Sequence, residues 1–516
     1  MTSDGARVST PQQTSTARKI GRGAMLAYAG LGPLDGVVAF ESGPLPPGVP
    51  ASVPTIWCAA SDDAALVEFE IEGTPICGPE PIACSLPGEP IDEVTLNGQP
   101  VMSVFGQTVC IASDLPAFFF ACLSRAEEVG AALDKHGRFD LNASALRPWL
   151  QRPVLDWWAH ALRLAIGRAG WALPRIEIAG GWHATLTHDV DHIDHVAKRP
   201  AASLEGGLVR KIADRLGRGE SAGERALRVW SDLERKHGWR GTYYFLGQLE
   251  GTANRGYEVS DERVSAAIRR LDEQGHEIGL HASYDAMTEP ELLAGERDRI
   301  ATLAGRTPGP GSLTGVRSHY LRYVHPATAY AHRDAGFAYD ASLGYTAETG
   351  YRAGTSRPFD AIDPADASPI GLTTVPFAMM DCSYLSALKL TQEQARERVT
   401  RQLEETRTLG GAASLLFHPC RLTTDGDPYD HLFRFCLDEL NRLGATVLTA
   451  GALAARYRAY AEINATRARI ADDHAEIDLD TPEGIGGIDI TPPADWELTL
   501  EEFGGGVRAR LTRSGA

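Results

Sequence analysis

The sequence predicts an α/β protein in which a β/α barrel, closed or nearly closed, lies between an N-terminal α+β domain and a small C-terminal β module. Three observations support this prediction. From about residue 180 to 455, short apolar runs alternate with helical stretches, which is typical of a largely parallel sheet covered by helices. Mixed strand and helix patterns precede this region, and two segments with strand-like alternation follow it.

The N-terminal part begins with residues 1–20, which are rich in Ser, Thr and Gln without apolar periodicity, so we expect them to be disordered. Residues 21–150 predict the α+β domain. Here "ALVEFEIEG" alternates like a strand, "EVTLNGQPVMSVFG" predicts two strands around an Asn-Gly turn, and "LPAFFFACLSRAEEVGAALDKHG" predicts a helix. The amphipathic stretch "LQRPVLDWWAHALRLAIGRAG", at about residues 150–170, predicts a helix, and residues 151–179 are expected to form a helical connector to the barrel.

The barrel is predicted over residues 180–460. Its strands are expected in the apolar runs "ATLTHDV", "GTYYFLG", "HEIGLH", "TGVRSHY", "FAYDASL", "TTVPFAM", "SLLFHP" and "ATVLTA". Helical periodicity lies between several of them, as in "DERVSAAIRRLDEQG" and "TQEQARERVTRQLEETRTLG". Residues 471–516 predict a small acidic β module, because "WELTL" and "VRARL" alternate and no Lys or Arg occurs between Ala471 and Val507.

Composition narrows the possible functions. The chain of 516 residues is long enough for about three domains, and its formal net charge of −18 argues against a general affinity for nucleic acid or anionic membranes. None of the eight cysteines forms a CxxC pair, which favours free thiols in a reducing compartment. The polar N-terminus lacks the apolar core of a signal peptide, and no window approaches 18 uninterrupted apolar residues. We therefore expect a cytoplasmic protein without a membrane span.

Residues 184–199, "ATLTHDVDHIDHVAKR", hold the densest group of chemically active side chains. Three aspartates and three histidines lie between Thr187 and His195. In an extended strand successive side chains alternate, so Asp189 and Asp191 share one face. Two carboxylates at the end of a barrel strand repel each other unless a cation or a proton offsets their charge. Barrel enzymes place catalytic groups at this end of the strands.

A second group stands in "GHEIGLHASYDA", residues 275–286. The predicted strand "HEIGLH" ends in His281, and Asp285 follows four residues later. A histidine and an aspartate at this spacing can converge on one metal ion. His276, at the entrance of the same strand, is expected at the far end of the barrel in a structural role.

Two more strand ends carry polar side chains. In "SLLFHPCRL" an apolar strand ends in His418, which suits a general acid or base. In "TGVRSHYLRY", Arg317 can orient a carboxylate by a paired hydrogen bond, and His319 and Tyr320 can line a pocket. One such residue alone would more often be structural, but four polar strand ends together indicate an active site.

In this order, the segments resemble the polysaccharide deacetylases, the NodB-homology family of carbohydrate esterases, whose fold is a distorted β/α barrel. The likeness covers about residues 180–455. "LTHDVD" resembles the first motif, which implies Asp189 as catalytic base and Asp191 as a metal ligand. "HEIGLHASYD" is similar to the second motif, "GVRSHY" to the arginine-bearing third, and "LLFHP" to the last, which implies His418 as general acid. "GFAYDASLGY" resembles a segment that follows the third motif in some branches, which makes Asp340 a further candidate.

The resemblance implies a metal-dependent hydrolase that cuts a non-peptide carbon–nitrogen bond and removes an acyl group, chiefly N-acetyl, from an amino sugar or saccharide. A divalent metal ion, zinc in the first place, would be held by Asp191, His281 and Asp285. It would polarise the acyl carbonyl and lower the pKa of bound water. The family's second motif usually ends in a second histidine, where this chain has Asp285. An aspartate is a competent ligand for zinc and for harder divalent ions.

The remaining candidates have roles in proton transfer and substrate binding. Asp189, held by Arg317, would take a proton from the attacking water, and His418 would protonate the departing amine. The candidate substrate-binding residues are His319, Tyr320 and Asp340.

Two alternatives stay open. A metal-independent amidohydrolase of the same fold, acting on a small cyclic amide or ureide such as allantoin, is favoured by Asp285. A catalytically silent barrel could instead bind a saccharide while its flanking domains mediate assembly. The presence of a base, a metal-ligand pair, an arginine and an acid argues for an enzyme whose partner is a saccharide or a sugar-containing small molecule. Upstream, "AFFFACLSRAEE", "DKHGRF" and "RPVLDWW" resemble an uncharacterised N-terminal region that accompanies a branch of the family.

Overall fold

The computed structural model describes residues 15–34, 39–42, 55–58, 66–71, 74–79, 92–96, 99–193, 221–247, 257, 259, 262–422, 427–471, 473–481 and 487–514. Residues 1–14 of the segment predicted to be disordered, and residues 194–199 of the His- and Asp-rich segment, lie outside these ranges. No helix in the described ranges is long and apolar enough to cross a membrane.

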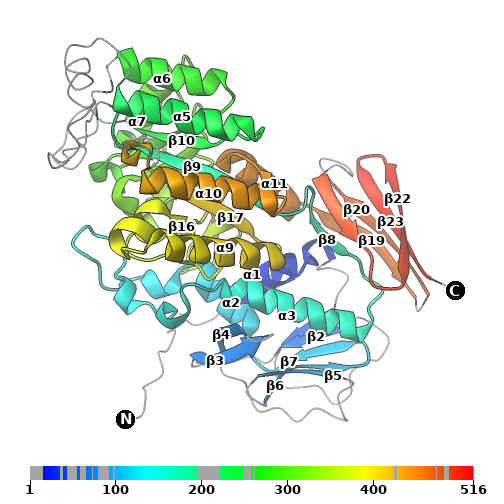
Figure 1. Cartoon of the computed structure of the whole chain (residues 1–516). Coiled ribbons are helices and arrows are strands. Elements are labelled where there is room, and N and C mark those ends of the chain that lie inside the picture. Colours follow the sequence, from blue (N-terminus) through cyan, green and yellow to red (C-terminus); the bar gives the residue numbers. More distant parts are fainter. Residues whose placement is uncertain are drawn as a thin grey trace, which may run out of the picture.

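The N-terminal part is built on a mixed five-stranded sheet with the strand order β1-β2-β7-β6-β5. Helices α1 and α3 lie between this sheet and the barrel (Figure 1). Strands β5 and β6 pair in antiparallel fashion, as predicted, while the Asn-Gly pair between them lies outside the described residues. The elements are α1 (Ser15–Tyr28), β1 (Ala39–Ser42), β2 (Thr55–Cys58), β3 (Leu66–Ile71), β4 (Thr74–Pro79), β5 (Asp92–Leu96), β6 (Gln99–Phe105), β7 (Thr108–Ile111), α2 (Leu115–Leu123) and α3 (Val154–Ala169).

The prediction of disorder over residues 1–20 is wrong for residues 15–20, which belong to helix α1. Helix α1 is stabilised by its contacts with helix α2 and with Asp114, the N-cap residue of α2. Arg18 Nε lies 3.0 Å from Asp114 Oδ2. A Cβ atom on Gly21 would overlap the backbone carbonyl of Pro116, so the two helices approach as closely as glycine permits. Such a tertiary contact has no signature in local composition.

Helix α2 is shorter than predicted and ends at Leu123. Its residues are all buried, whereas the chain beyond it carries charged side chains that find partners of their own. Arg125 takes a left-handed backbone conformation with φ 51°, and its guanidinium lies 2.8 Å from Glu128 Oε1. Glu128 also accepts a hydrogen bond of 2.8 Å from Arg352 of the barrel region. These buried ion pairs hold the turn against the barrel and stop the helix.

The barrel region is a curled sheet with the strand order β14-β15-β13-β12-β11-β10-β9-β17-β16, and β18 pairs with β9. All pairs in it are parallel except β14 with β15. Each apolar run predicted to be a strand overlaps one. In the described chain the edge strands β14 and β16 do not pair with each other, so the sheet is a partly open, distorted barrel. Its strands are β9 (His183–Val190), β10 (Thr242–Leu246), β11 (Glu277–Ala282), β12 (Gly315–Ser318), β13 (Tyr339–Asp340), β14 (Phe359–Ile362), β15 (Pro369–Thr374), β16 (Met379–Met380), β17 (Ala412–Phe417) and β18 (Thr446–Val447).

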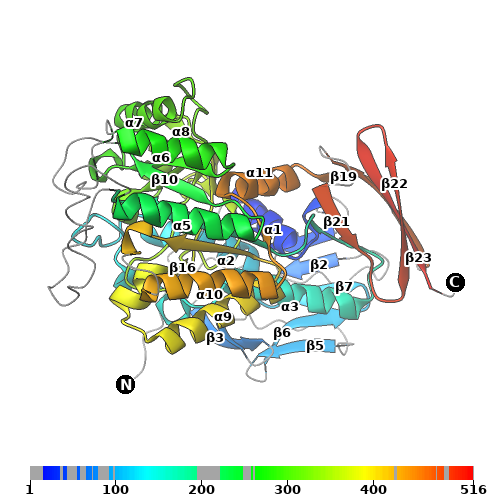
Figure 2. The ribbon, with the colours of Figure 1, turned by 45° about the horizontal axis from the view of Figure 1, so that its top comes forward.

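Helices cover the outer side of this sheet, as the alternation predicted (Figure 2). Helix α9 shows how local sequence defines such a helix: the side chain of Thr391 accepts a hydrogen bond from the backbone of Gln394, whose side chain in turn caps the backbone of Thr391. The helices are α5 (Ala222–Lys236), α6 (Glu262–Glu273), α7 (Pro290–Leu303), α8 (Ala327–Asp334), α9 (Gln392–Thr408), α10 (Pro428–Arg442) and α11 (Ala450–Ala461).

The C-terminal part is an antiparallel sheet with the order β19-β20-β23-β22, set beside the barrel in both views (Figure 1 and Figure 2). Acidic side chains of β20 face basic ones of β23, and Arg508 Nε lies 2.5 Å from Asp478 Oδ1. The sheet starts at Asn464, ahead of the boundary expected at residue 471. A separate ribbon of β8 and β21 joins the connector to the tail. The strands are β8 (Arg175–Ile178), β19 (Asn464–Ile470), β20 (His474–Asp480), β21 (Ile488–Thr491), β22 (Trp496–Phe503) and β23 (Gly506–Arg513).

Candidate active site

The strands that carry the candidate residues end at one edge of the curled sheet. Asp189 lies on β9, His281 on β11 and Arg317 on β12, while His418 directly follows β17. Strand β10 joins β9 to β11, β12 pairs with β11, and β17 pairs with β9, all in parallel. Because parallel strands have their C-terminal ends on the same side, these side chains meet there. The structure thus brings together the polar side chains at the four strand ends, as expected from the sequence.

Asp189 is a buried carboxylate at the centre of this group. Its Oδ1 accepts a hydrogen bond of 2.9 Å from Nη1 of Arg317, and the same nitrogen donates to Thr187 Oγ1 at 3.0 Å. Arg317 therefore holds Asp189 through one nitrogen, where a paired hydrogen bond was expected. The other carboxylate oxygen, Oδ2, lies 3.7 Å from Nε2 of His281 and 4.0 Å from Nε2 of His418. Asp189 thus stands between an imidazole on each side.

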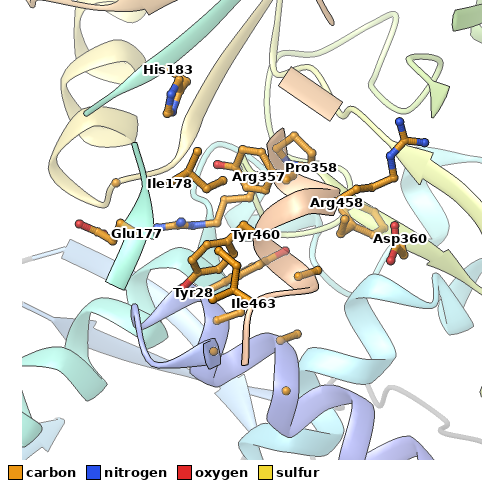
Figure 3. Close-up of a pocket in the computed structure, with 18 of the residues that line it drawn as sticks. Tyr28, Glu177, Ile178, His183, Arg357, Pro358, Asp360, Arg458, Tyr460 and Ile463 are labelled. Atoms are coloured by element: carbon orange, nitrogen blue, oxygen red, sulfur yellow. The ribbon is translucent and has the colours of Figure 1, made fainter. Parts of the chain in front are cut away.

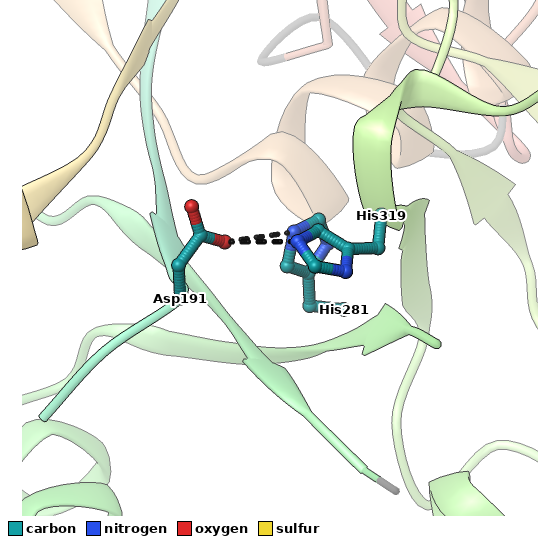
Figure 4. Close-up of side chains that lie close together, drawn as sticks. All are labelled: Asp191, His281 and His319. Carbon is teal, nitrogen blue, oxygen red and sulfur yellow. Dashed lines mark ion pairs between the residues drawn. The ribbon is translucent and has the colours of Figure 1, made fainter. Parts of the chain in front are cut away.

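Asp191, His281 and His319 form a compact group in which the possible metal-ligand atoms all lie within 4.8 Å of one another (Figure 4). Oδ1 of Asp191 lies 3.3 Å from Nε2 of His281 and 3.7 Å from Nε2 of His319. Among the described residues, both Asp191 Oδ1 and His281 Nε2 are buried without a hydrogen-bond partner. Buried polar atoms in folded proteins almost always have partners, so a bound group between Asp191 Oδ1 and His281 Nε2 would satisfy both atoms.

The hydrogen bonds of His281 suit a metal ligand. Its Nδ1 lies 2.9 Å from the backbone carbonyl of Arg317, a contact in which the N–H must be the donor. This places the proton on Nδ1 and leaves the lone pair of Nε2 directed at Asp191, the arrangement that metal-binding histidines commonly have. One carboxylate with two imidazoles is a donor set that zinc accepts, with room for water or substrate. The three residues therefore fit a divalent cation.

The electrostatics of the group agree with this fit. Burial, followed by the neighbouring His281, lowers the pKa of His319 to about 4, so His319 is a neutral imidazole at physiological pH. Burial opposes the charge of Asp191, but the adjacent imidazoles of His281 and His418 hold its pKa below the ordinary value. Burial also disfavours the charged form of His281, but the carboxylate of Asp189 outweighs it and raises its pKa. The pocket thus favours positive charge beside its two aspartates.

The prediction that Asp285 is a metal ligand is wrong, because the structure does not bring Asp285 to Asp191 and His281. Asp285 lies exposed on the short 3₁₀ helix η5 (Tyr284–Ala286). Its direction is set one residue after β11, where the backbone N–H of Ser283 donates to Glu296 Oε2 at 2.9 Å. The chain therefore turns towards helix α7, and a spacing of four residues does not return Asp285 to the metal-ligand atoms. His319, predicted to bind substrate, takes the third position instead.

The prediction that Asp340 binds substrate is also wrong. The residue is fully buried and engaged elsewhere. Its carboxylate lies 2.5 Å from Nδ1 of His332 on helix α8 and accepts a hydrogen bond of 2.7 Å from the backbone of Ser342. A carboxylate that joins strand β13 to the helix packed on it stabilises the barrel and has no oxygen left for a substrate.

The opposite face of β9 is structural. His188 points away from the site, with Nε2 2.6 Å from Oε1 of Glu234. Glu234 also accepts a hydrogen bond of 3.1 Å from Tyr243 and lies 3.4 Å from Nδ1 of His276. His276 accepts a hydrogen bond from the backbone of Gly241 at 3.1 Å. The structural role predicted for His276 is therefore what its contacts indicate.

Asp381 is a residue of the site that the sequence analysis did not single out. Its Oδ1 lies 2.7 Å from Nδ1 of His418, and its Oδ2 accepts a hydrogen bond of 2.8 Å from the backbone of His418. Burial alone would lower the pKa of His418, but the Cys382 sulfur, 3.6 Å from Nδ1, and the Asp381 carboxylate raise it well above its ordinary value. A signal was present, since Asp381 directly follows β16, two residues beyond the end of the run "TTVPFAM". It is a fifth polar strand end.

The N-terminal part also reaches the rim of the site. Tyr320, 42% exposed beside His319, takes a left-handed backbone conformation with φ 60°. Arg138 donates a hydrogen bond of 2.9 Å to the Tyr320 carbonyl, and the ring of His136 lies 5.2 Å from the Tyr320 ring. Arg322 donates in return to the carbonyl of His136 at 2.7 Å. These contacts join residues 180 positions apart and have no motif in the sequence.

Comparisons with known proteins give a partial match. Residues 69–169 match DUF7033, a family of unknown function. No curated protein sequence matches the chain. Among solved structures, a protein of Mycobacterium smegmatis assigned as a polysaccharide deacetylase shares 19% identity and a TM-score of 0.40 over 58% of this chain and 98% of that chain. The carbohydrate deacetylase Agd3 shares 9% identity and a TM-score of 0.40 over 80% and 71%. Puue allantoinase shares 15% identity and a TM-score of 0.36 over 54% and 90%.

Proposed function

We propose that this protein is a metal-dependent hydrolase that removes an acyl group, chiefly N-acetyl, from an amino sugar or other saccharide. One observation carries the proposal: Asp191 Oδ1 and His281 Nε2, buried without a hydrogen-bond partner among the described residues, converge with His319 beside a carboxylate and a second histidine. Asp191, His281 and His319 would hold a divalent cation. When bound, such a cation polarises an acyl carbonyl and lowers the pKa of a water molecule.

The proton transfers would be performed by two groups of the chain. Asp189, fixed on one side by Arg317, has Oδ2 directed into the site, where it can take a proton from the attacking water. As the water oxygen bonds to the acyl carbon, the carbon–nitrogen bond breaks and the amine needs a proton. His418 carries one because its pKa is raised, and its Nε2 faces the site at 4.0 Å from Asp189. The products are a carboxylic acid and a free amine.

The two alternative hypotheses, a metal-independent amidohydrolase and a saccharide-binding module, have less support than a metal-dependent hydrolase. The metal-free alternative was favoured by Asp285 in place of a ligand histidine, and a second imidazole, that of His319, now lies with Asp191 and His281 and supports a metal site. A silent saccharide-binding barrel has no need for a buried Asp–His pair such as Asp381 and His418 at the exits of its strands.

An assay of acyl release tests this function. The full chain, stripped with a chelator and then reloaded with Zn²⁺, is incubated with N-acetylated saccharides and, separately, with allantoin. We expect acetate from the saccharides only in the reloaded protein, because the metal is needed to activate water. Hydrolysis of allantoin that persists after stripping would favour the metal-free alternative. Saccharide binding without hydrolysis by the reloaded protein would favour the binding module.

We further propose that residues 132–140 form part of the substrate-binding rim, which gives the DUF7033 part of the chain a role in the reaction. Tyr320, Tyr284 and His136 form an aromatic group at this rim, with ring centroids 5.2–6.1 Å apart. Exposed aromatic rings beside a catalytic centre suit the apolar faces of sugar rings. Arg138 is a positioning residue here, since it reaches the site only through the carbonyl of Tyr320.

Replacing Arg138 by alanine is expected to raise KM about tenfold and leave kcat and the bound metal nearly unchanged, because a hydrogen bond from a charged donor to a strained backbone is lost. The measurement is steady-state kinetics with the best saccharide from the screen. Arg138→Lys should recover part of the loss, and Arg147→Ala, at an exposed arginine of the same region, should have no effect. An equal fall in kcat and metal content would show that Arg138 only stabilises the fold.

A further inference from the structure

Figure 3 shows a cavity of about 650 Å³ near the N-terminal end of strand β9, whereas the candidate active site lies at the C-terminal end of that strand. The cavity is bordered by His183, the first residue of β9, whereas Asp191 follows the last residue of that strand. At about 3.3 Å per residue, the two positions are roughly 26 Å apart. Side chains from α1, β8, β14, α11 and the end of α9 line the cavity, so the N-terminal part, the barrel and the connector all contribute to it.

Two arginines of this cavity converge on a single acceptor. Nη2 of Arg163 donates to the backbone carbonyl of Leu409 at 3.1 Å, and Nη2 of Arg357 donates to the same oxygen at 2.8 Å. The other contacts of Arg163 are with the carbonyl of Tyr28 at 2.8 Å and with Nδ1 of His160 at 3.4 Å. All of its acceptors are neutral, and two guanidinium groups are held side by side.

Two carboxylates that line the cavity have other partners in the described chain: Asp360 accepts a hydrogen bond of 3.3 Å from Thr373 Oγ1, and Asp489 accepts one of 3.0 Å from the backbone of Gly180. Asp156 Oδ1 lies 3.4 Å from Nε of Arg357, but Arg357 Nε is buried without a hydrogen-bond partner in the described chain. Glu177 is paired with Arg175 at 2.9 Å. Burial, followed by the neighbouring Arg357, lowers the pKa of Arg163 to about 10, which is the sign of a cation without a matching anion. Arg163 is half-buried and has no carboxylate partner in the described chain, so an anion between it and the buried Arg357 would offset a partly desolvated positive charge.

The other walls of the cavity are largely apolar. Helix α1 contributes Ile20, Ala24 and Ala27. Phe359 from β14 and Ile463 from the chain after α11 also line the cavity. A cavity of this size with apolar walls and a few converging polar groups is typical of sites for small organic molecules. We propose that it binds a small amphipathic anion, whose carboxylate or phosphate group lies between Arg163 and Arg357 and whose apolar part lies against α1. Guanidinium pairs recognise both oxyanions through charge-assisted hydrogen bonds.

Isothermal titration of the full chain with four probes tests this site: decanoate, decyl phosphate, decanol and inorganic phosphate. We expect at least one of the two anionic amphiphiles to bind about tenfold or more tightly than both decanol and inorganic phosphate, and the tighter of the two identifies the head group. Equal binding of decanol would overturn the role of the arginines. Equal binding of inorganic phosphate would overturn the role of the apolar walls.

Two kinds of variant locate the binding. Arg163→Gln should weaken the anionic probe about tenfold or more. Gly23 lines the cavity, and a Cβ atom built on it meets nothing within 4 Å, so Gly23→Phe should place its ring in the cavity and abolish binding. Gly295→Phe is the matched control, an equally open helical glycine on α7 outside the cavity, and should bind like the native chain. Unchanged binding by Gly23→Phe, with a native melting temperature, would place the probe elsewhere and refute the site.

The proposed function does not enter this test. Asp189→Asn, altered in the candidate active site, should bind the anionic probe as tightly as the native chain. Weaker binding by that variant would mean that the probe occupies the active site, and the cavity proposal would fail while the hydrolase proposal stood.

Discussion

Replacing His319 by alanine is expected to lower the affinity for Zn²⁺ by more than the roughly 10- to 100-fold loss typical of changes behind a metal ligand. The physical reason is the loss of one of three ligands: Nε2 of His319 lies 3.7 Å from Asp191 Oδ1, within the group that fits a cation. Competition with a chromophoric chelator measures the affinity, and metal analysis after dialysis measures the bound zinc. Activity should fall with metal content.

Asp285→Ala is the matched control, because Asp285 lies three residues after the neighbouring strand β11 and is exposed. It should keep native zinc affinity and activity. The opposite pattern, with zinc lost in Asp285→Ala and kept in His319→Ala, would restore the ligand set first inferred from the sequence. Melting temperatures of both variants separate loss of a ligand from loss of the fold.

Asp189→Asn is expected to lower kcat by roughly 10²- to 10⁴-fold, the range typical for loss of a general base, with metal content nearly unchanged. The amide keeps the shape of the carboxylate but cannot accept a proton. Because Asp191, His281 and His319 remain, the cation should stay bound. Single-turnover acetate release and metal analysis of the same preparation check both halves of the expectation.

Asp191→Asn distinguishes a base from a ligand within the same strand end. It should lose zinc, since a neutral amide oxygen is a poor replacement for a charged ligand, and excess Zn²⁺ should restore part of the activity. If Asp189→Asn is the variant that loses zinc, the roles of the two aspartates are interchanged. Full activity in both variants would contradict hydrolysis at this site.

The geometry of the candidate site gives the N-terminal part a place in the proposed reaction. His319 and Tyr320 lie in the loop that follows β12, and residues of the DUF7033 match hold that loop from outside. The left-handed conformation of Tyr320 is costly for a non-glycine residue, so the surrounding contacts must maintain it. A barrel expressed without residues before about 150 would lack Arg138 and the ring of His136.

The sequence by itself determined the sheet and much of the site, because both follow from short-range periodicity. Strand–helix alternation requires parallel strands whose exits share one end, and the two-residue period of β9 places Asp189 on one face and His188 on the other. The structure has both features. Polar residues directly at strand exits, such as His281 and His418, could therefore be assigned from the sequence.

Only the tertiary structure decided what lies one loop further on. Asp285 is directed away by a contact between Ser283 and Glu296, while His319 is brought inward next to a Tyr320 held by Arg138, and the second of these contacts joins residues 182 positions apart. The same holds for helix α1, which forms where Gly21 lets it approach α2. Local periodicity carries no information on such contacts, because their energy comes from burial and hydrogen bonding between segments that meet only in the folded chain.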